Sequence, residues 1–574
     1  VINLPGLINL TCLCPLTSGG ARVPVTRDAD GWSDVTPDTG SGDRYVYVSA
    51  AGSDSNDGLS TGAPKLTVAA GIAALRNNRS DQCLLRRGDT FTATVTVNLS
   101  GRSSTHPMVV LGAYGTTTNA RPIVTGGVRL QSGSNLVFQS IDFRNNNTLN
   151  GCIYAQNNGL GLRGSGILIE DCIARDYSQS FGQAYCFTSG SGVPGGTYWN
   201  DITIRRSTAV DSNGFHGQGL FIDAYGGQLT LEDFTLINCG TNDSQSHCVY
   251  IDKAVATAST PIITRVLCWP NYPTTANVST TSEGVKSRQG AIMSDCHMAW
   301  CAIGFAIGTT DGDGSNDFVV LGTVQAKIDN CIVTNACGLT TANAYGYGAW
   351  LLGIEGTGNY MRNCGFANTL STSNDRAWLT LIRWNAAATG GQIDNLSMSG
   401  NVAYNAGKFV VADLPTNYRN LVFSNNKIRV SDTFAPLIEH YQNTSQTSIF
   451  TERQNNSLWS GAATGSWVSA PANGNLTAYG ASSAGSAGAG LTAPTRNYTG
   501  YLATKSVTVA NESAAHAHIR TQLIAQRRYA WNADYTPTAF NDWYRVGLGI
   551  DPIGSVVTPT VTAPSYYLET IGAR

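Results

Sequence analysis

A six-residue phrase that alternates apolar and polar positions recurs along the middle of the chain. Its copies end at Ile141, Cys172, Ser207, Phe234, Cys268, Cys296, Cys331, Cys364, Asn401 and Asn426, roughly 25 to 37 residues apart. The alternation predicts a half-buried β-strand, and a strand that returns at a nearly fixed period predicts a solenoid whose turns bury their apolar faces on one another. We therefore predict a parallel β-helix, in which the last position of the phrase forms an inward-facing ladder rich in cysteine.

A second strand follows the first in each repeat and supports the same fold. Its copies begin at Cys152, Tyr185, Gly219, Cys248, Glu283, Gly304, Gly348, Ala377, Lys408 and Pro436. Because neighbouring strands lie about 4.8 Å apart, about ten or more turns predict a rod on the order of 50 Å long. The predicted fold class is therefore all-β.

The segment ahead of the repeats, residues 44–75, reads RYVYVSAAGSDSNDGLSTGAPKLTVAAGIAAL, and GDT follows at 88–90. Thr67 is a suitable N-cap for a short helix that places Val68, Ile72 and Leu75 on one face. Such a helix would cover the open N-terminal end of the rod and block edge-to-edge association.

This segment and the repeats, over residues 44–449, resemble the right-handed parallel β-helix proteins of the pectate-lyase-like superfamily, and in particular bacteriophage tailspikes and polysaccharide depolymerases. The resemblance implies a right-handed coil and a polysaccharide partner. It leaves the reaction open, because unrelated activities share this fold.

The changes of pattern along the chain divide it into five parts. We expect an N-terminal extension or attachment segment at 1–43, a cap with the first strands at 44–125, the β-helix at 126–460, a linker rich in Gly, Ala and Ser at 461–490, and a C-terminal region at 491–574. Helices are predicted over 512–531 and 535–547. They would either cap the C-terminal end of the rod or pack against sister chains.

Composition narrows the partners. Only 13% of the residues are charged and the net charge is −2, which argues against nucleic acid because no basic stripe neutralises phosphates. No apolar run is long enough for membrane insertion. The 14 cysteines lack zinc-site spacing, so we expect buried, reduced thiols and no thiolate metal site. The chain begins at Val1 without a basic leader, which makes this stretch a poor signal peptide.

Charged residues gather on the outward positions of three successive copies of the second strand. One outward column holds Phe221, Tyr250 and Lys286, and the next holds Asp223, Asp252 and Arg288; Glu283 opens the EGVKSR strand, and His216 and His247 precede their strands. Paired carboxylates suit glycoside hydrolysis, whereas a lyase needs a base and cations, with Asp223 and Asp252 able to hold Ca²⁺. Otherwise no cofactor is expected. EGVKSR also resembles a strand common in β-helix repeats, so Lys286 has a purely structural reading.

Aromatic residues offer a second kind of contact. Trp350 and Trp378 lie on successive later turns, where they would stack on sugars or serve as core or intersubunit aromatics. With His216, His247 and Tyr250, they are our candidate substrate-binding residues. Asp311 and Asp313 favour a turn over a Ca²⁺ loop.

Three functions remain open. The first is a homotrimeric virion tailspike, assembled in the host cytoplasm and joined to other tail proteins by the N-terminal segment, that binds and cleaves bacterial surface polysaccharide. The second is a secreted polysaccharide lyase or glycoside hydrolase. The third is a non-catalytic β-helical adhesin or fibre. Reduced thiols favour the first.

Overall fold

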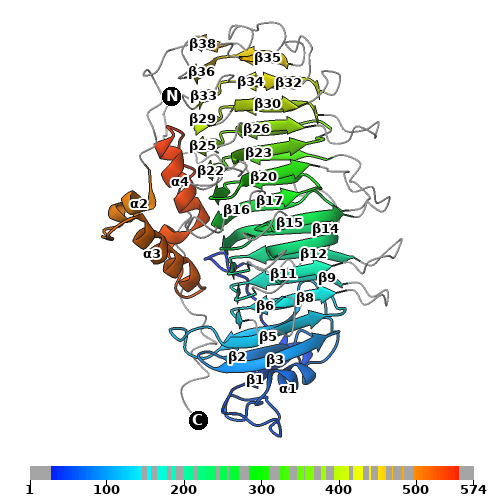
Figure 1. Ribbon diagram of the computed structural model, residues 1–574. Coiled ribbons are helices and arrows are strands. Elements are labelled where there is room, and N and C mark those ends of the chain that lie inside the picture. Colours follow the sequence, from blue (N-terminus) through cyan, green and yellow to red (C-terminus); the bar gives the residue numbers. More distant parts are fainter. Residues whose placement is uncertain are drawn as a thin grey trace, which may run out of the picture.

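The computed structural model describes residues 27–144, 151–156, 164–177, 182–188, 198–212, 217–240, 246–254, 258–269, 283–308, 324–335, 346–354, 356–367, 376–382, 393–406, 408–412, 418–430, 438–440, 450–460, 468–469, 481–483 and 496–554. In this part of the chain the strands pair in parallel, turn upon turn, and build a three-sided rod (Figure 1). The predicted parallel β-helix is confirmed.

Each turn contributes to three parallel sheets, A, B and C, in chain order. Sheet A contains β1 (Tyr45–Val48), β2 (Gln82–Arg86), β4 (Met108–Tyr114), β6 (Leu136–Gln139), β9 (Gly164–Glu170), β12 (Trp199–Arg205), β14 (Gln218–Ile237), β16 (Ile262–Trp269), β18 (Ala291–Ser294), β21 (Ala326–Asp329), β24 (Asn359–Arg362), β28 (Leu396–Ser399), β32 (Leu421–Ser424) and β35 (Phe450–Gln454). Sheet B contains β5 (Ile123–Leu130), β7 (Asp142–Arg144), β10 (Ile173–Arg175), β13 (Thr208–Val210), the last parts of β14 and β16, β19 (His297–Ala299), β22 (Ile332–Thr334), β25 (Gly365–Ala367), β29 (Val402–Ala406), β33 (Lys427–Val430), β36 (Asn456–Ser460) and β38 (Ala481–Ser483). Sheet C contains β3 (Thr90–Val97), part of β5, β8 (Ile153–Gln156), β11 (Gln183–Thr188), the first part of β14, β15 (Val249–Ala254), β17 (Glu283–Ser287), β20 (Ile303–Gly308), β23 (Gly346–Leu352), β26 (Arg376–Ile382), β30 (Lys408–Ala412), β34 (Ile438–His440) and β37 (Val468–Ser469). A separate pair joins β27 (Ile393–Asp394) to β31 (Tyr418–Arg419).

A left-handed residue forms the corner between sheets A and B in every turn from β6 onward. The residues with positive φ at this corner are Ser140, Asp171, Arg206, Asp233, Arg265, Asp295, Asn330, Asn363, Gly400, Asn425 and Asn455. Asn, Asp and Gly tolerate this conformation best, which explains their repetition there. The side chain directly after the corner points into the rod.

That inward position forms the predicted ladder, with one correction. Cys172, Cys296, Cys331 and Cys364 occupy it, are fully buried, and have free thiols. Burial raises the pKa of the Cys172 thiol to about 12, so it stays protonated. Cys268 does not belong to this column: it lies opposite Leu236 and Met298, two residues further along, and Val266 fills the ladder position. Because Arg265 is the left-handed corner residue of this turn, the inward position directly after it belongs to Val266.

The same column continues as stacked asparagines. The Asn401 side chain donates to Asn426 Oδ1, and Asn426 donates to Asn456 Oδ1, both at 3.0 Å. The backbone N–H of Cys364 donates to Asn401 Oδ1 at 3.1 Å, which links the two parts of the ladder. All three amides are buried, so the interior polar groups of this column are satisfied by their neighbours.

The rod extends beyond the predicted C-terminal bound at 460, and the first strands expected within 44–125 belong to the same parallel pairing. Parallel pairing already begins between β1 and β2, and it still includes β37 and β38, which lie in the expected linker 461–490. The cap helix α1 (Val68–Ala73) is present, with the Thr67 hydroxyl accepting from the Ala70 N–H. Val68 and Ile72 are buried against β1–β3.

The C-terminal region covers one side of the rod instead of its end. Helices α2 (Tyr498–Thr504), α3 (Glu512–Ala525) and α4 (Pro537–Gly547) lie beside sheet B (Figure 1). The ring centroids of Trp269 in β16 and Tyr498 in α2 lie 5.3 Å apart. The side-chain amide of Asn541 in α4 donates to the backbone carbonyl oxygens of Cys296 and Asn330. These contacts contradict the expected cap at the C-terminal end, since the helices bury an apolar strip along the flank. In the described part of the chain, no helix has the length and hydropathy to cross a bilayer.

The described part of the N-terminal segment also lies on the rod. The η1 turn (Thr39–Ser41) precedes β1, and Val35 packs on the outward face of sheet A. Trp32 lies 5.6 Å from Trp531 of the C-terminal region, and Arg528 forms an ion pair with Asp28 at 2.6 Å. The described N-terminal segment and the segment after α3 therefore meet on the same side of the rod.

Candidate functional site

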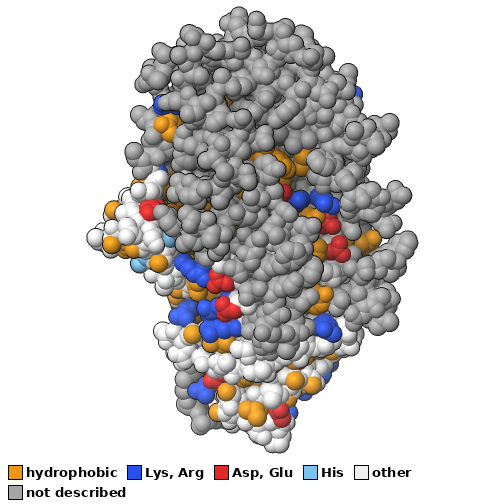
Figure 2. Space-filling view, viewed as in Figure 1, with side chains coloured by type: hydrophobic (Ala, Val, Ile, Leu, Met, Phe, Trp, Pro, Cys, Tyr) orange, Lys and Arg blue, Asp and Glu red, His pale blue; other side chains and the backbone are white. Residues whose placement is uncertain are grey.

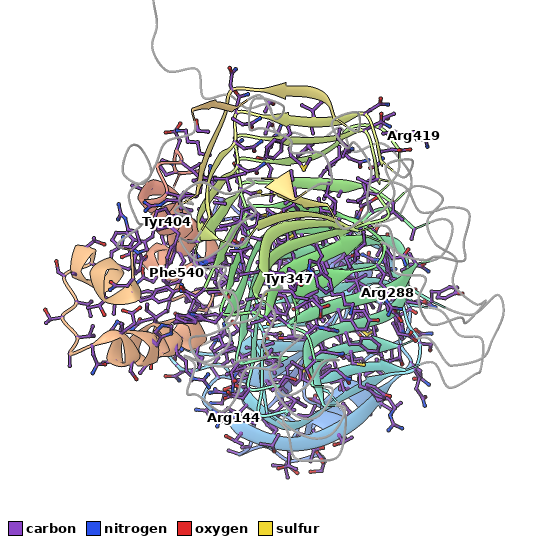
Figure 3. The ribbon with its side chains drawn as sticks, turned by 45° about the horizontal axis from the view of Figure 1, so that its top comes forward. Arg144, Arg288, Tyr347, Tyr404, Arg419 and Phe540 are labelled. Atoms are coloured by element: carbon purple, nitrogen blue, oxygen red, sulfur yellow. The ribbon has the colours of Figure 1, made fainter. Side chains whose placement is uncertain are left out.

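The predicted alternation in sheet C is correct. Leu220, Val249, Val285 and Phe305 pair in register and are fully buried, as are Ile222, Ile251, Ser287 and Ile307. Because neighbouring residues point to opposite faces, Phe221, Tyr250 and Lys286 project outward from β14, β15 and β17. Figure 3 shows Arg288 on this flank, away from Phe540 and the C-terminal helices.

Tyr250 lies at the centre of the outward cluster. Its ring contacts the rings of Phe221 and His247, with centroids 5.5 and 5.0 Å away. Two cations face the same ring, Lys286 Nζ at 5.4 Å and Arg288 Cζ at 5.6 Å from the centroid. These distances are typical of cation–π contacts.

The Tyr250 hydroxyl is bonded to a carboxylate. It donates to Asp252 Oδ1 at 3.0 Å, and Arg288 forms an ion pair with the same oxygen at 2.9 Å. Burial raises the pKa of Tyr250 well above its ordinary value, and Asp252 adds to this effect. Tyr250 is therefore a neutral phenol at neutral pH, held by a carboxylate that Arg288 stabilises.

A second carboxylate lies beside the first pair. Glu283 contacts His247 Nδ1, and its Oε1 lies 3.3 Å from Lys286 Nζ. Burial alone raises the pKa of a carboxyl, but His247 and Lys286 outweigh it and hold the pKa of Glu283 below its ordinary value. Glu283 is therefore a carboxylate that anchors Lys286.

Six of the ten predicted site residues thus form one contact network: His247, Tyr250, Asp252, Glu283, Lys286 and Arg288. Asp223 stands outward on β14 in the register position next to Asp252. Trp350 lies in the same outward column as Tyr250, two strands beyond Lys286, with Ala306 between. Its ring is 5.0 Å from that of Tyr347.

The remaining candidates lie wholly or partly outside the described residues. His216, Asp311 and Asp313 fall there, and for Trp378 only the backbone position in β26 is described. What sequence reasoning missed is the hydrogen bond from the Tyr250 hydroxyl to Asp252. The position of Tyr250 two residues before Asp252, on the same face of the strand, is the signal that links them.

The expected Ca²⁺ pair does not fit the geometry. Asp252 already accepts from Tyr250 and from the cation Arg288, so a metal would have to displace a guanidinium from its carboxylate. Among the described residues, no three His, Cys, Asp or Glu side chains converge as a metal site would require.

Comparison with known proteins gives structural matches of low similarity. No protein-family model matches the chain, and no curated protein matches it. The alginate lyase AlyGC of the PL6 family is 12% identical with a TM-score of 0.40, over 74% of this chain and 53% of that one. A rhamnogalacturonan lyase is 14% identical with a TM-score of 0.33, over 72% and 87%. The GH136 lacto-N-biosidase of Eubacterium ramulus is 13% identical with a TM-score of 0.24, over 77% and 67%. The chain spans about half the length of the alginate lyase.

Proposed function

We propose that the protein degrades an acidic polysaccharide by β-elimination, with the sugar chain lying along the outward face of sheet C. The observation that carries this proposal is the environment of Tyr250. Its hydroxyl donates a hydrogen bond to Asp252, and the cations Lys286 and Arg288 lie 5.4 and 5.6 Å from the centroid of its ring. A uronate offers a carboxylate for the cations and, beside it, an acidic C5 proton for the phenol.

The proposed step balances as follows. Tyr250 accepts the C5 proton while it passes its own proton to Asp252; the C4–O bond breaks, and a C4–C5 double bond forms. The proton then returns from Asp252 through Tyr250 to the leaving oxygen. Lys286 and Arg288 stabilise the charge that develops on the uronate carboxylate. Acid–base groups of this kind contribute about 10²–10⁴-fold to a rate.

Hydrolysis fits the same residues less well. Glycosidases of the usual kind need one protonated carboxylic acid beside a carboxylate. Here the pKa of Glu283 is held low, and Asp252 is bound by Arg288. Both carboxyl groups are held as carboxylates by basic partners, so neither rests as the protonated acid with which a glycosidase begins.

Incubation with alginate, polygalacturonate and neutral dextran tests the reaction. Elimination yields reducing ends together with the ultraviolet absorbance of the C4–C5 double bond, on an acidic polymer only. Reducing ends without this absorbance would point to hydrolysis instead. If neither reducing ends nor absorbance appears, the protein binds polysaccharide without cleaving it, as an adhesin would.

The setting of this activity is a finer proposal. The cysteines of the described residues are free and buried, which supports folding in a reducing cytoplasm and so a homotrimeric virion tailspike over a secreted enzyme. Light scattering separates the two, because a secreted monomer would show the 60.6 kDa mass of one chain.

A further inference from the structure

A cavity of about 740 Å³ lies between the C-terminal region and the first strands of sheet B. It is lined from the rod by Arg121, Asp142, Ile173 and Arg175, and from the other side by α3 and the segment after it. Ligand sites for small molecules commonly have volumes in this range. Arg288 and the outward cluster of sheet C lie on another flank, whereas Arg144, the partner of Asp142, lies on the side of the helices (Figure 3).

The charges around the cavity favour an anion. Its lining includes three arginines, Arg121, Arg175 and Arg527, and two aspartates, Asp142 and Asp534. Within the lining, Arg175 is already ion-paired with Asp142, to which its Nε donates at 2.8 Å. Each aspartate also contacts a cation beyond the lining: Arg144 contacts Asp142 at 3.1 Å, and Lys505 contacts Asp534 at 2.6 Å. One further anion, Asp171, pairs with Arg121.

The lining and its direct ion-pair partners therefore carry five cations and three anions, a surplus of two positive charges. Figure 2 shows basic and acidic side chains gathered on the face below the C-terminal helices.

Arg527 is the cation most available to a ligand. Its described hydrogen bonds go to the backbone carbonyl oxygens of Asn119 and Thr118, at 3.2 and 3.0 Å. Burial lowers the pKa of Arg527, and repulsion from Arg121 and Arg87 lowers it further. A site that disfavours its own cation gains by accepting an anion, because the new negative charge offsets this repulsion.

The other lining groups match a sugar. Trp531 and Ile173 provide apolar surface for a pyranose face, and the amides of Gln522 and Asn532 provide donors and acceptors for hydroxyl groups. The Gln526 side chain fixes the wall of the cavity, since it donates to the carbonyl oxygens of Asn532 and Tyr535. Polar groups converging around an apolar patch are the usual pattern of a specific small-ligand site.

We propose that this cavity is a second binding site for an acidic saccharide, separate from the cluster on sheet C, that takes a uronate carboxylate on Arg527 and on the N–H groups of Arg175 that do not donate to Asp142. The inference rests on the proposed function only in the choice of an acidic sugar. The site holds a short anionic segment of the polymer and keeps the enzyme on its substrate between cleavage events.

Binding of tetragalacturonate to the full-length chain tests the proposal, with titration calorimetry as the readout. The measurement uses Tyr250→Phe as the background, so that the ligand is not cleaved. Arg527→Gln and Arg175→Gln should each weaken binding about tenfold, the scale of one lost charge-assisted hydrogen bond. The matched control is Arg419→Gln, which removes an exposed, ion-paired arginine on β31 far along the rod.

Two ligand controls define the chemistry. Neutral maltotetraose should bind far more weakly than tetragalacturonate, and equal binding would overturn the charge argument. Sodium sulfate that matches tetragalacturonate in affinity would reduce the cavity to a simple anion site and overturn the saccharide assignment. If neither cavity variant changes the affinity while both keep the parent melting temperature, the second site does not exist.

The outcomes keep this inference apart from the proposed function. Loss of tetragalacturonate binding in Arg527→Gln supports the second site even if no acidic polymer is cleaved. Conversely, cleavage of an acidic polymer with unchanged binding in both cavity variants upholds the proposed function and refutes the second site.

Discussion

The hydroxyl of Tyr250 and the carboxylate of Asp252, on neighbouring outward positions of one strand, are joined by a hydrogen bond of 3.0 Å. The strand geometry makes this contact, because residues i and i+2 lie on the same face. Arg288 of the next turn completes it. The alternation of side chains within β15 places the Tyr250 phenol beside its proton acceptor Asp252, and the pairing of β15 with β17 adds Arg288.

Tyr250→Phe tests this pair directly. The change removes the hydroxyl and keeps the ring contacts with Phe221, so cleavage should fall about 10²–10⁴-fold while the melting temperature changes little. The control is Tyr154→Phe, which removes the same group three strands earlier in the same outward column. Equal rates in Tyr250→Phe and the parent chain would exclude Tyr250 as the proton carrier.

Lys286→Met tests the role of the cation. Without the ammonium, the rate on a free-acid polymer should fall about 10- to 100-fold, because one charge that stabilises the uronate carboxylate is lost. On the methyl-esterified polymer, which has no carboxylate charge, the same variant should lose much less. Lys327→Met, on the outward side of β21 in sheet A, is the matched control. An equal loss on both polymers would assign Lys286 a structural role.

A chelator should leave cleavage unchanged. The Asp252 carboxylate already binds Arg288 and Tyr250, so elimination as proposed needs no divalent cation. Dialysis against EDTA, followed by the ultraviolet assay with and without added Ca²⁺, checks this. Activity that disappears with EDTA and returns with Ca²⁺ would contradict the ion pair as the resting arrangement.

How far the sequence predicts this molecule depends on whether a feature is local. The period of the phrase and its alternation predict the ladders correctly, because each strand's facing follows from its own residues. The prediction placed Cys268 in the inward ladder incorrectly, because the six-residue phrase alone does not show where the corner between sheets A and B lies. In most turns an Asn, Asp or Gly in the sequence marks this corner, because these residues favour its left-handed conformation. In the turn of Cys268 the corner residue is Arg265, which gives no such indication.

Contacts between the segment around Trp32 and the C-terminal region were not predictable. Trp32 and Trp531 meet across almost the whole sequence, and the Arg528 guanidinium pairs with Asp28. No periodicity connects such residues, and the segment around Trp32 carries no strand or helix signal. The position of the C-terminal helices was missed for the same reason. An amphipathic pattern predicts that one face of a helix is buried, but it does not indicate against which side of the rod that face packs.

Asn426→Ala should destabilise the rod substantially. Asn426 is fully buried, donates to Met398 O and Asn456 Oδ1, and accepts from Asn401. Its loss leaves buried partners without hydrogen bonds, at a cost of about 2–4 kcal/mol. Asn98→Ala, at an exposed position directly after β3 where φ is not positive, should cost less than about 1 kcal/mol. Denaturant unfolding compares them, and similar midpoints for the two variants would contradict the buried ladder.

Acid should weaken the attachment of the C-terminal helices through His297. This histidine of β19 is fully buried, contacts Thr334 Oγ1 at 3.0 Å, and lies 5.2 Å from the Tyr544 ring of α4. Burial lowers its pKa to about 3. The unfolded chain, with a histidine pKa of about 6.5, binds the proton first, so the stability from neutral His297 is fully present above about pH 6.5 and declines as the pH falls toward 3.

The slope gives the test of His297. Linkage predicts a loss of up to about 1.4 kcal/mol per pH unit in this window from His297 alone. His516 adds to it with the same sign, since burial lowers its pKa to about 4. Unfolding free energies of the parent chain, His297→Gln and the surface control His106→Gln, compared at about pH 8 and about pH 5, separate the contributions. His297→Gln should show a smaller loss between the two pH values than the parent or the control, whatever its stability at the higher pH. The same loss in all three proteins would mean that His297 reaches solvent in the folded state, and that α4 does not seal sheet B.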